Sequence, residues 1–171
     1  MISLYRIRDF IFMDTVNLSG NLLGFISDIF LDFNKKQVKG FVITPNNIFK
    51  KSLNVFIKDV VSLTSVIVVT NANKNKYFQF NDIKRMNVVD EKGCLIGMVE
   101  DILFDEESFC IKAVILSTGF INNFIKGKKI LLIDDLTLGE ENLFYRGKKE
   151  NLKFFNSPHA LFNSDKTSER K

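Results

Sequence analysis

The chain has 171 residues, 46% of them apolar, which is enough for one ordinary domain or for two small ones. It lacks the run of about eighteen apolar residues that a membrane helix needs. The N-terminal stretch MISLYRIRDFIF is interrupted by Arg6, Arg8 and Asp9. We therefore expect neither a membrane span nor a signal peptide, and we place the protein in the cytoplasm. Cys94 and Cys110 lack a CxxC spacing and are expected to be free thiols.

The formal net charge of +4 comes from the end of the chain. Residues 1–145 carry 17 Lys and Arg against 17 Asp and Glu, whereas residues 146–171 carry 7 against 3. A protein that binds duplex nucleic acid through its fold usually has a basic bias across that fold. The even balance argues against duplex binding and leaves a local basic patch open.

Short β-branched and aromatic runs follow one another along the chain, separated by Asn, Gly, Lys and Asp turns. In chain order, GFISDIFLD and VKGFVIT are expected to form a hairpin around FNKKQ, followed by strands NVFI and SVIVV. NANKNK has linker composition. MVEDILFD and IKAVIL form a second expected hairpin around EESF, followed by strand KILLI. This pattern predicts an all-β fold.

The chain repeats itself. Residues 13–32 align with 86–105 without a gap, and eight of the twenty positions are identical. The similarity resumes later if a three-residue insertion is allowed in the second copy. A long period seen twice indicates a duplicated small domain. We expect repeat one over residues 1–72, repeat two over 77–145 and a basic C-terminal tail over 146–171.

Glycines and aspartates recur at fixed places in both copies, and we expect them to be structural. The glycines are Gly20 and Gly93, expected at a turn with positive φ, and Gly24 and Gly97, expected at a bend or close backbone approach. The aspartates are Asp28, Asp32, Asp101 and Asp105. Within one strand, aspartates four residues apart lie about 13 Å from each other, too far to share a cation. We expect them to accept backbone N–H groups in turns. The alternative is that pseudo-symmetry brings Asp28 near Asp101.

The turn glycine followed by L-x-G-x-[IV]-x-D-[IV]-x-x-D and a segment such as VKGFVI resembles the PRC-barrel domain. The stand-alone PRC-barrel proteins of spore-forming bacteria are similar, and the reaction-centre H subunit and the ribosome-maturation factor RimM are more distantly so. The resemblance covers nearly all of residues 4–145, once per copy. It implies two tandem small β-barrels, which we expect to be related by a pseudo-twofold axis. The fold carries over from the two distant relatives but their functions do not, and sporulation and RNA metabolism stay open as processes in which the protein acts.

Two loops share Asn-Asn, then Phe beside Ile, then a Lys pair. The partner-binding candidates in them are Asn46, Asn47, Phe49, Lys50, Lys51, Asn122, Asn123, Phe124, Lys126, Lys128 and Lys129. An aromatic ring flanked by cations suits an acidic protein surface or a single-stranded base. The alternative is that Phe49 and Phe124 cap the barrels and the lysines are only solvated.

Catalytic groups are scarce. The single histidine, His159, lies in the tail, and no phosphate loop, dinucleotide fingerprint or HExxH motif occurs. We therefore expect a non-catalytic binding or adaptor protein with no metal, no cofactor and a protein partner. The alternative is an RNA- or ribosome-associated factor. The sequence leaves the partner's identity and the oligomeric state open, a homodimer included.

Overall fold

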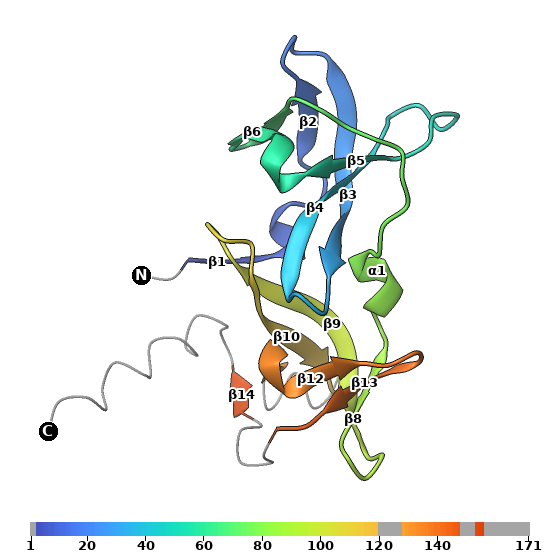
Figure 1. Ribbon diagram of the computed structural model, residues 1–171, viewed down its shortest axis with the longest axis vertical. Helices are drawn as coiled ribbons and strands as arrows, with labels where there is room; N and C mark the ends of the chain where they lie inside the picture. The colour runs from blue at the N-terminus through green and yellow to red at the C-terminus, as the bar shows by residue number, and fades with distance from the viewer. Residues whose placement is uncertain (1–2, 120–127, 148–152, 156–171) are drawn as a thin grey trace, which may run out of the picture. The chain divides into compact units, whose positions relative to one another are not determined.

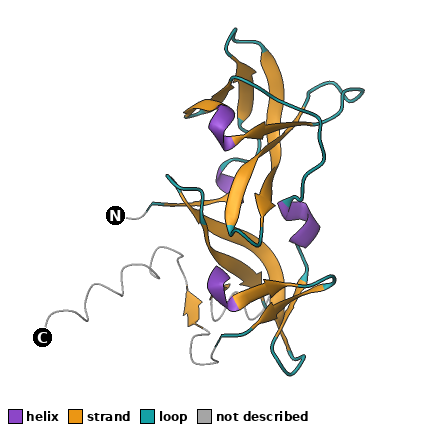
Figure 2. Ribbon diagram, viewed as in Figure 1, coloured by secondary structure: helices purple, strands orange, loops and turns teal. Residues whose placement is uncertain are grey.

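The computed structural model describes residues 3–119, 128–147 and 153–155, and these residues form an all-β structure with two sheets (Figures 1 and 2). The chain divides into two compact units. The first unit is Arg6–Ile83, and the second unit combines residues 1–5 with 84–171. The predicted all-β class is confirmed. In the described part of the chain, no helix has the length and apolar character of a membrane span.

The first unit holds one six-stranded sheet in the order β5-β4-β3-β2-β7-β6. Strands β2 and β7 pair in parallel, and the other neighbours are antiparallel. The strands are β2 (Asp14–Asn17), β3 (Leu22–Asp32), β4 (Gln37–Thr44), β5 (Leu53–Phe56), β6 (Val60–Leu63) and β7 (Val66–Val69). The helical turns are η1 (Ile7–Asp9), η2 (Ile57–Asp59) and α1 (Phe80–Ile83).

The second unit repeats this order as β12-β13-β8-β9-β10-β11 and adds β14 beside β11 and β1 beside β9. The strands are β1 (Leu4–Arg6, whose last residue belongs to the first unit), β8 (Asn87–Val89), β9 (Leu95–Asp105), β10 (Ile111–Ser117), β11 (Lys128–Leu132), β12 (Leu136–Leu138), β13 (Asn142–Tyr145) and β14 (Lys153–Phe155). The 3-10 turn η3 (Ile133–Asp135) lies between β11 and β12. Residues 153–155 of the predicted tail are thus an edge strand.

Both predicted hairpins are present as β3–β4 and β9–β10. Each long central strand has a bulge at the same place, at Ser27 in β3 and at Glu100 in β9. A bulge bends a strand and increases its twist. The long strand can then pack one face of its sheet into a core, where Ile26 and Ile29 of β3 are fully buried.

The prediction of closed barrels is wrong, because neither sheet closes on itself. In the first unit β5 and β6 are the two edges, although only η2 separates them in the chain. The residues that flank η2, Phe56 and Val60, both have extended backbones. The chain therefore turns a corner there instead of forming a hairpin, and no ladder joins the two edges.

The segment that leads into each repeat pairs with the sheet of the other repeat. By the alignment, Leu4–Arg6 corresponds to residues 77–79. Leu4–Arg6 is β1 and pairs with β9 of repeat two, whereas Gln79 bridges Phe30 in β3 of repeat one. Each sheet is thus completed by the leading segment of the other copy. The repeat boundaries at 1–72 and 77–145 stay a prediction about the duplication, and the compact units divide the chain elsewhere.

Candidate partner-binding surface

The loop between β4 and β5 presents two large apolar side chains to solvent. The Asn47 side-chain oxygen accepts the backbone N–H of Phe49 at 2.9 Å, and the Asn47 carbonyl accepts the N–H of Lys50 at 3.0 Å. These bonds fold residues 47–50 into a tight turn. Ile48 is 89% exposed and Phe49 is 90% exposed. Phe49 therefore does not cap the sheet, and the alternative of a buried ring is wrong for this residue.

The corresponding loop of repeat two gives a different outcome. Asn122, Asn123, Phe124 and Lys126 lie outside the described residues. Lys128 and Lys129 lie in β11, and both have partners within the second unit. The Lys128 ammonium pairs with the Glu100 carboxylate, and Lys129 Nζ donates to the Ile96 carbonyl at 3.4 Å.

The predicted linker folds back onto the first unit beside β5. Asn54 and Asn73 exchange backbone hydrogen bonds of 2.7 and 2.9 Å, and Asn54 Nδ2 donates to the Asn75 carbonyl at 2.6 Å. Asn73 and Asn75 thus both bond to Asn54, and Tyr77 contacts Phe56 at the end of the same strand. The linker therefore adds two exposed lysines, Lys74 and Lys76, next to β5, the strand that follows the loop.

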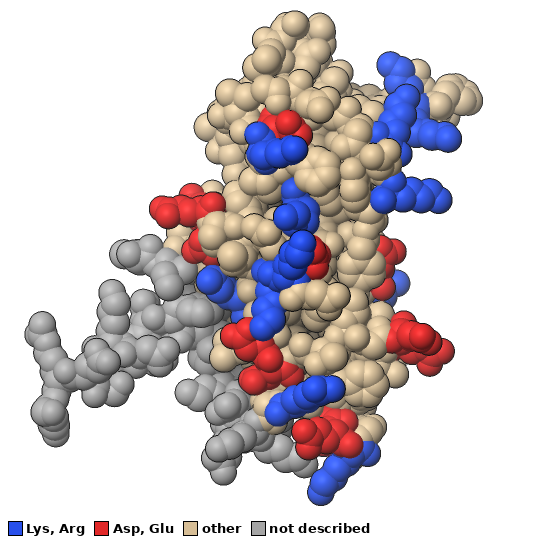
Figure 3. Space-filling view, viewed as in Figure 1, with Lys and Arg blue, Asp and Glu red and all other residues tan. Residues whose placement is uncertain are grey.

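Four exposed lysines from the two segments gather at this place. We call the group the lysine surface: Ile48, Phe49, Lys50, Lys51, Lys74 and Lys76. In Figure 3, blue side chains gather around the part of the first unit where Figure 1 shows the loop before β5. In the described part of the chain, none of these lysines has a carboxylate partner. Residues 6–83 carry ten Lys and Arg against six Asp, a net charge of +4.

Tyr77 fixes the end of the linker. Its ring stacks on Phe30 with 4.7 Å between centroids and meets Phe56 edge-on at 5.3 Å. The Phe78 carbonyl accepts the backbone N–H of Leu31 at 2.9 Å. These contacts explain why the linker is ordered. Sequence reasoning missed Lys74 and Lys76, and the aromatic pair directly after them was the signal that the segment is anchored.

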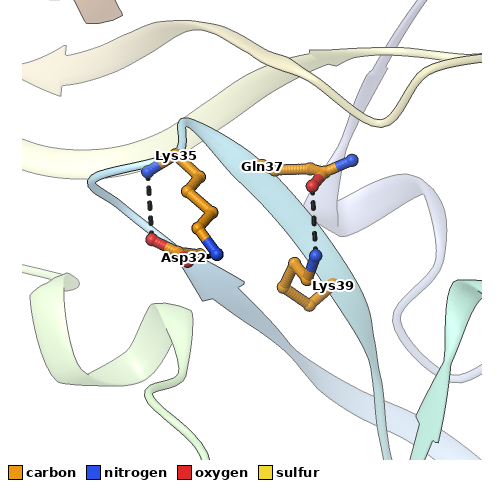
Figure 4. A network of polar contacts seen from close by, with 4 residues as sticks. All are labelled: Asp32, Lys35, Gln37 and Lys39. Atoms are coloured by element: carbon orange, nitrogen blue, oxygen red, sulfur yellow. Dashed lines mark hydrogen bonds and ion pairs between the residues drawn. The ribbon is translucent and has the colours of Figure 1, made fainter.

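Asp32 and Asp105, the second repeated aspartate of each copy, have the predicted role in a turn. Asp32 Oδ1 accepts the backbone N–H of Lys35 at 3.0 Å, and the Lys35 ammonium lies 3.7 Å from Asp32 Oδ2. Figure 4 shows this turn beside a bond of 3.1 Å from Lys39 Nζ to Gln37 Oε1. The equivalent Asp105 accepts both the N–H and the hydroxyl of Ser108, and the hydroxyl bond in particular lowers the pKa of this carboxyl.

Asp28 and Asp101 differ from the prediction, since they lie within strands and are buried, with 3% and 8% exposure. Each accepts the N–H of the next residue at 2.8 Å. Asp28 also accepts the N–H of Asn81 in α1 at 3.0 Å, so it fastens α1 to β3. No group of three or more metal-ligating side chains occurs within residues 3–119, 128–147 and 153–155.

The glycine predictions agree with the backbone. Gly20 and Gly93 both have φ of +78° in the turns before the long strands. A Cβ at Gly24 would lie 2.2 Å from the Thr44 carbonyl oxygen, and one at Gly97 would lie 2.8 Å from the Ser117 oxygen. Both positions therefore require close backbone approach.

In the first unit, the described residues form a small β module with an exposed apolar turn beside four lysines. Residues 75–136 match the family model of the PRC-barrel domain. The predicted resemblance to the PRC-barrel domain is therefore confirmed for the second repeat, where the one match lies, and a domain of this type indicates a small binding or adaptor module. No curated protein matches the chain.

Proposed function

We propose that the chain is a non-catalytic, cytoplasmic binding or adaptor protein that engages a protein partner through the lysine surface. The observation that carries the proposal is the exposure of Ile48 and Phe49, 89% and 90%, on a turn held by Asn47. A large exposed aromatic side chain gains more from burial in a partner than almost any other residue. The four lysines around it would speed association with an acidic surface.

Three described groups have shifted pKa values that are explained by their own local contacts. The pKa of Asp105 is lowered by its bonds with Ser108, and the pKa of Glu106 is lowered by hydrogen bonds from Ser3 and Tyr5. Burial raises the pKa of Tyr145. Each shift has a local cause at a turn or in a strand of the second unit, and these groups do not form an acid–base pair.

An RNA-binding role is the second candidate, because the same lysines could contact phosphates while Phe49 stacks on a base. The two candidates differ in their response to salt. Affinity for RNA should fall steeply between about 50 and 200 mM salt, because phosphate contacts release counterions. Binding that depends mainly on burial of Ile48 and Phe49 should change much less.

The test compares tagged variants in pull-downs from the native host. Ile48→Ser with Phe49→Ser removes the apolar part of the lysine surface, and Leu18→Ser is the matched control, because Leu18 is 66% exposed in the same unit. We expect a protein that the wild type and the control retain and that the double variant loses. The pull-down is repeated after the lysate is treated with ribonuclease. Capture that survives the treatment favours a protein partner, and capture that is lost favours RNA. Equal capture by all three forms would contradict the proposal.

A further inference from the structure

The second unit contains a shallow pocket of about 260 Å³ next to the bulge of β9. Its walls are Lys84, Arg85, Met98, Val99, Glu100 and Ser117. Val99 is buried and forms the floor with Met98, which is 40% exposed. The pocket thus has an apolar floor and a charged rim, the combination that holds a small ligand by its body and orients it by its charge.

Among the described residues, the rim of the pocket carries two cations without a carboxylate partner. Over the second unit the charges balance, since residues 84–171 carry 14 Lys and Arg against 14 Asp and Glu. At the pocket, by contrast, the Glu100 carboxylate is already paired with Lys128. Lys84 and Arg85 have no carboxylate partner in the part of the chain that the structure describes. Two uncompensated cations therefore face a pocket on a unit whose charges otherwise balance.

Repeat one has two aromatic rings at the same place. By the alignment, Arg85 corresponds to Phe12 and Met98 to Phe25. The Phe12 and Phe25 rings contact each other with 5.7 Å between centroids. Arg85 and Phe12 even share an unusual backbone, with φ of +68° and +71°. The backbone is thus alike in the two repeats, but repeat two has two flexible side chains where repeat one has two rings, which leaves space for one ring.

The polar side chains at the bulge also differ between the two copies. In repeat one the bulge residue Ser27 accepts a hydrogen bond from the Thr44 hydroxyl at 2.8 Å. In repeat two the bulge residue is Glu100, and Ser117 occupies the position that corresponds to Thr44. Because Lys128 neutralises Glu100, the charge left for a ligand at this pocket is that of Lys84 and Arg85.

We infer that this pocket binds a small organic anion, a carboxylate attached to one aromatic or similarly sized apolar group. The apolar group lies on Met98 and Val99, where repeat one has rings. The carboxylate meets Arg85, whose planar guanidinium can bind both carboxylate oxygens, and Lys84 adds a second positive charge. This site is separate from the lysine surface, and it gives the second repeat a role that the first repeat lacks.

The test is an NMR titration of the ¹⁵N-labelled full chain with phenylacetate. Acetate, which has no ring, and benzyl alcohol, which has no charge, are the matched ligands. We expect saturable shifts of the Val99, Glu100 and Ser117 amides with a Kd at or below about 1 mM. Acetate and benzyl alcohol should each bind at least tenfold more weakly.

Two variants place the binding at the pocket. Arg85→Phe with Met98→Phe copies the rings of repeat one, and Phe12 shows that phenylalanine accepts this positive φ. It should weaken phenylacetate binding at least tenfold, whereas Lys92→Ser, an exposed cation on a turn of the same unit, should leave it unchanged. If the ring variant does not fold, Lys84→Ser with Arg85→Asn makes the same test. Absence of saturable shifts, or equal binding by the pocket variants, would overturn the inference while leaving the lysine surface untouched.

Discussion

Replacement of Tyr77 by alanine tests whether the linker is an anchored part of the first unit. In an unanchored linker this change would cost almost nothing, since exposed loop substitutions usually alter stability by less than about 0.5 kcal/mol. In the structure Tyr77 is half-buried between Phe30 and Phe56. The same contacts hold Lys74 and Lys76 next to β5, so the substitution also disturbs the lysine surface.

The expected cost follows from these contacts. Two aromatic pairs contribute about 0.5–1.5 kcal/mol each beyond the area that they bury. Loss of a half-buried ring adds about 1 kcal/mol, roughly half the value of a fully buried large side chain. Tyr77→Ala should therefore lower the free energy of unfolding by about 2–4 kcal/mol. Tyr77→Phe should cost less than about 0.5 kcal/mol, because the bond from Asn75 Nδ2 to the hydroxyl is long, 3.3 Å.

Urea denaturation followed by circular dichroism measures both changes. Phe78→Ala is the control in the same segment, because its side chain is 39% exposed and its carbonyl bond to Leu31 does not need the ring. A loss below about 1 kcal/mol for Tyr77→Ala, or an equal loss for Phe78→Ala, would refute the anchoring of the linker.

Three further changes test the structure of the repeats. Gly24→Ala should cost about 3–5 kcal/mol, because its Cβ would meet a backbone oxygen at 2.2 Å, whereas Gly20→Ala, with nothing within 4 Å, should cost about 1 kcal/mol; equal melting temperatures would contradict this. Thr15→Val should stabilise the protein by about 1 kcal/mol in urea titrations, because the hydroxyl is buried and has no hydrogen-bond partner in the described residues. Ser108→Ala should raise the pKa of Asp105 in a carbon-13 NMR titration. Because that pKa is lowered in the folded state, its contribution to stability is present above the ordinary value and lost as pH falls, so the variant should be less sensitive to acid.

The sequence was sufficient to predict the hairpins, the turn glycines and the internal repeat. These features depend on local chemistry that the two copies share, such as the positive φ of Gly20 and Gly93. The repeated pattern singled out Asp28 as a structural residue but did not predict that it bonds to α1. Its second partner is the N–H of Asn81, and 53 residues separate the two in the chain. A local pattern carries no information about such a partner.

The arrangement of the leading segments could not be predicted, because residues 4–6 and 77–79 do not themselves specify the repeat with which they pair. The closed barrels were implied by the family resemblance, and the sequence does not reveal that η2 and η3 are three-residue corners. The similarity of the two copies also drew attention away from the positions at which they differ. Thr15 of repeat one is Val88 in repeat two, and Phe12 is Arg85, and only the structure shows what these exchanges do.

The exchange of leading segments is the feature on which the placement of the linker and its lysines depends, and aromatic NOEs test it directly. The chain has three tyrosines, so their ring signals can be assigned by single substitutions. The structure predicts NOEs from Tyr77 to Phe30, at 4.7 Å between centroids, and from Tyr5 to Phe104, at 6.1 Å. NOEs from Tyr5 to Leu31 and from Phe78 to Phe104, with the predicted pairs missing, would show that each repeat keeps its own leading segment and would contradict the account.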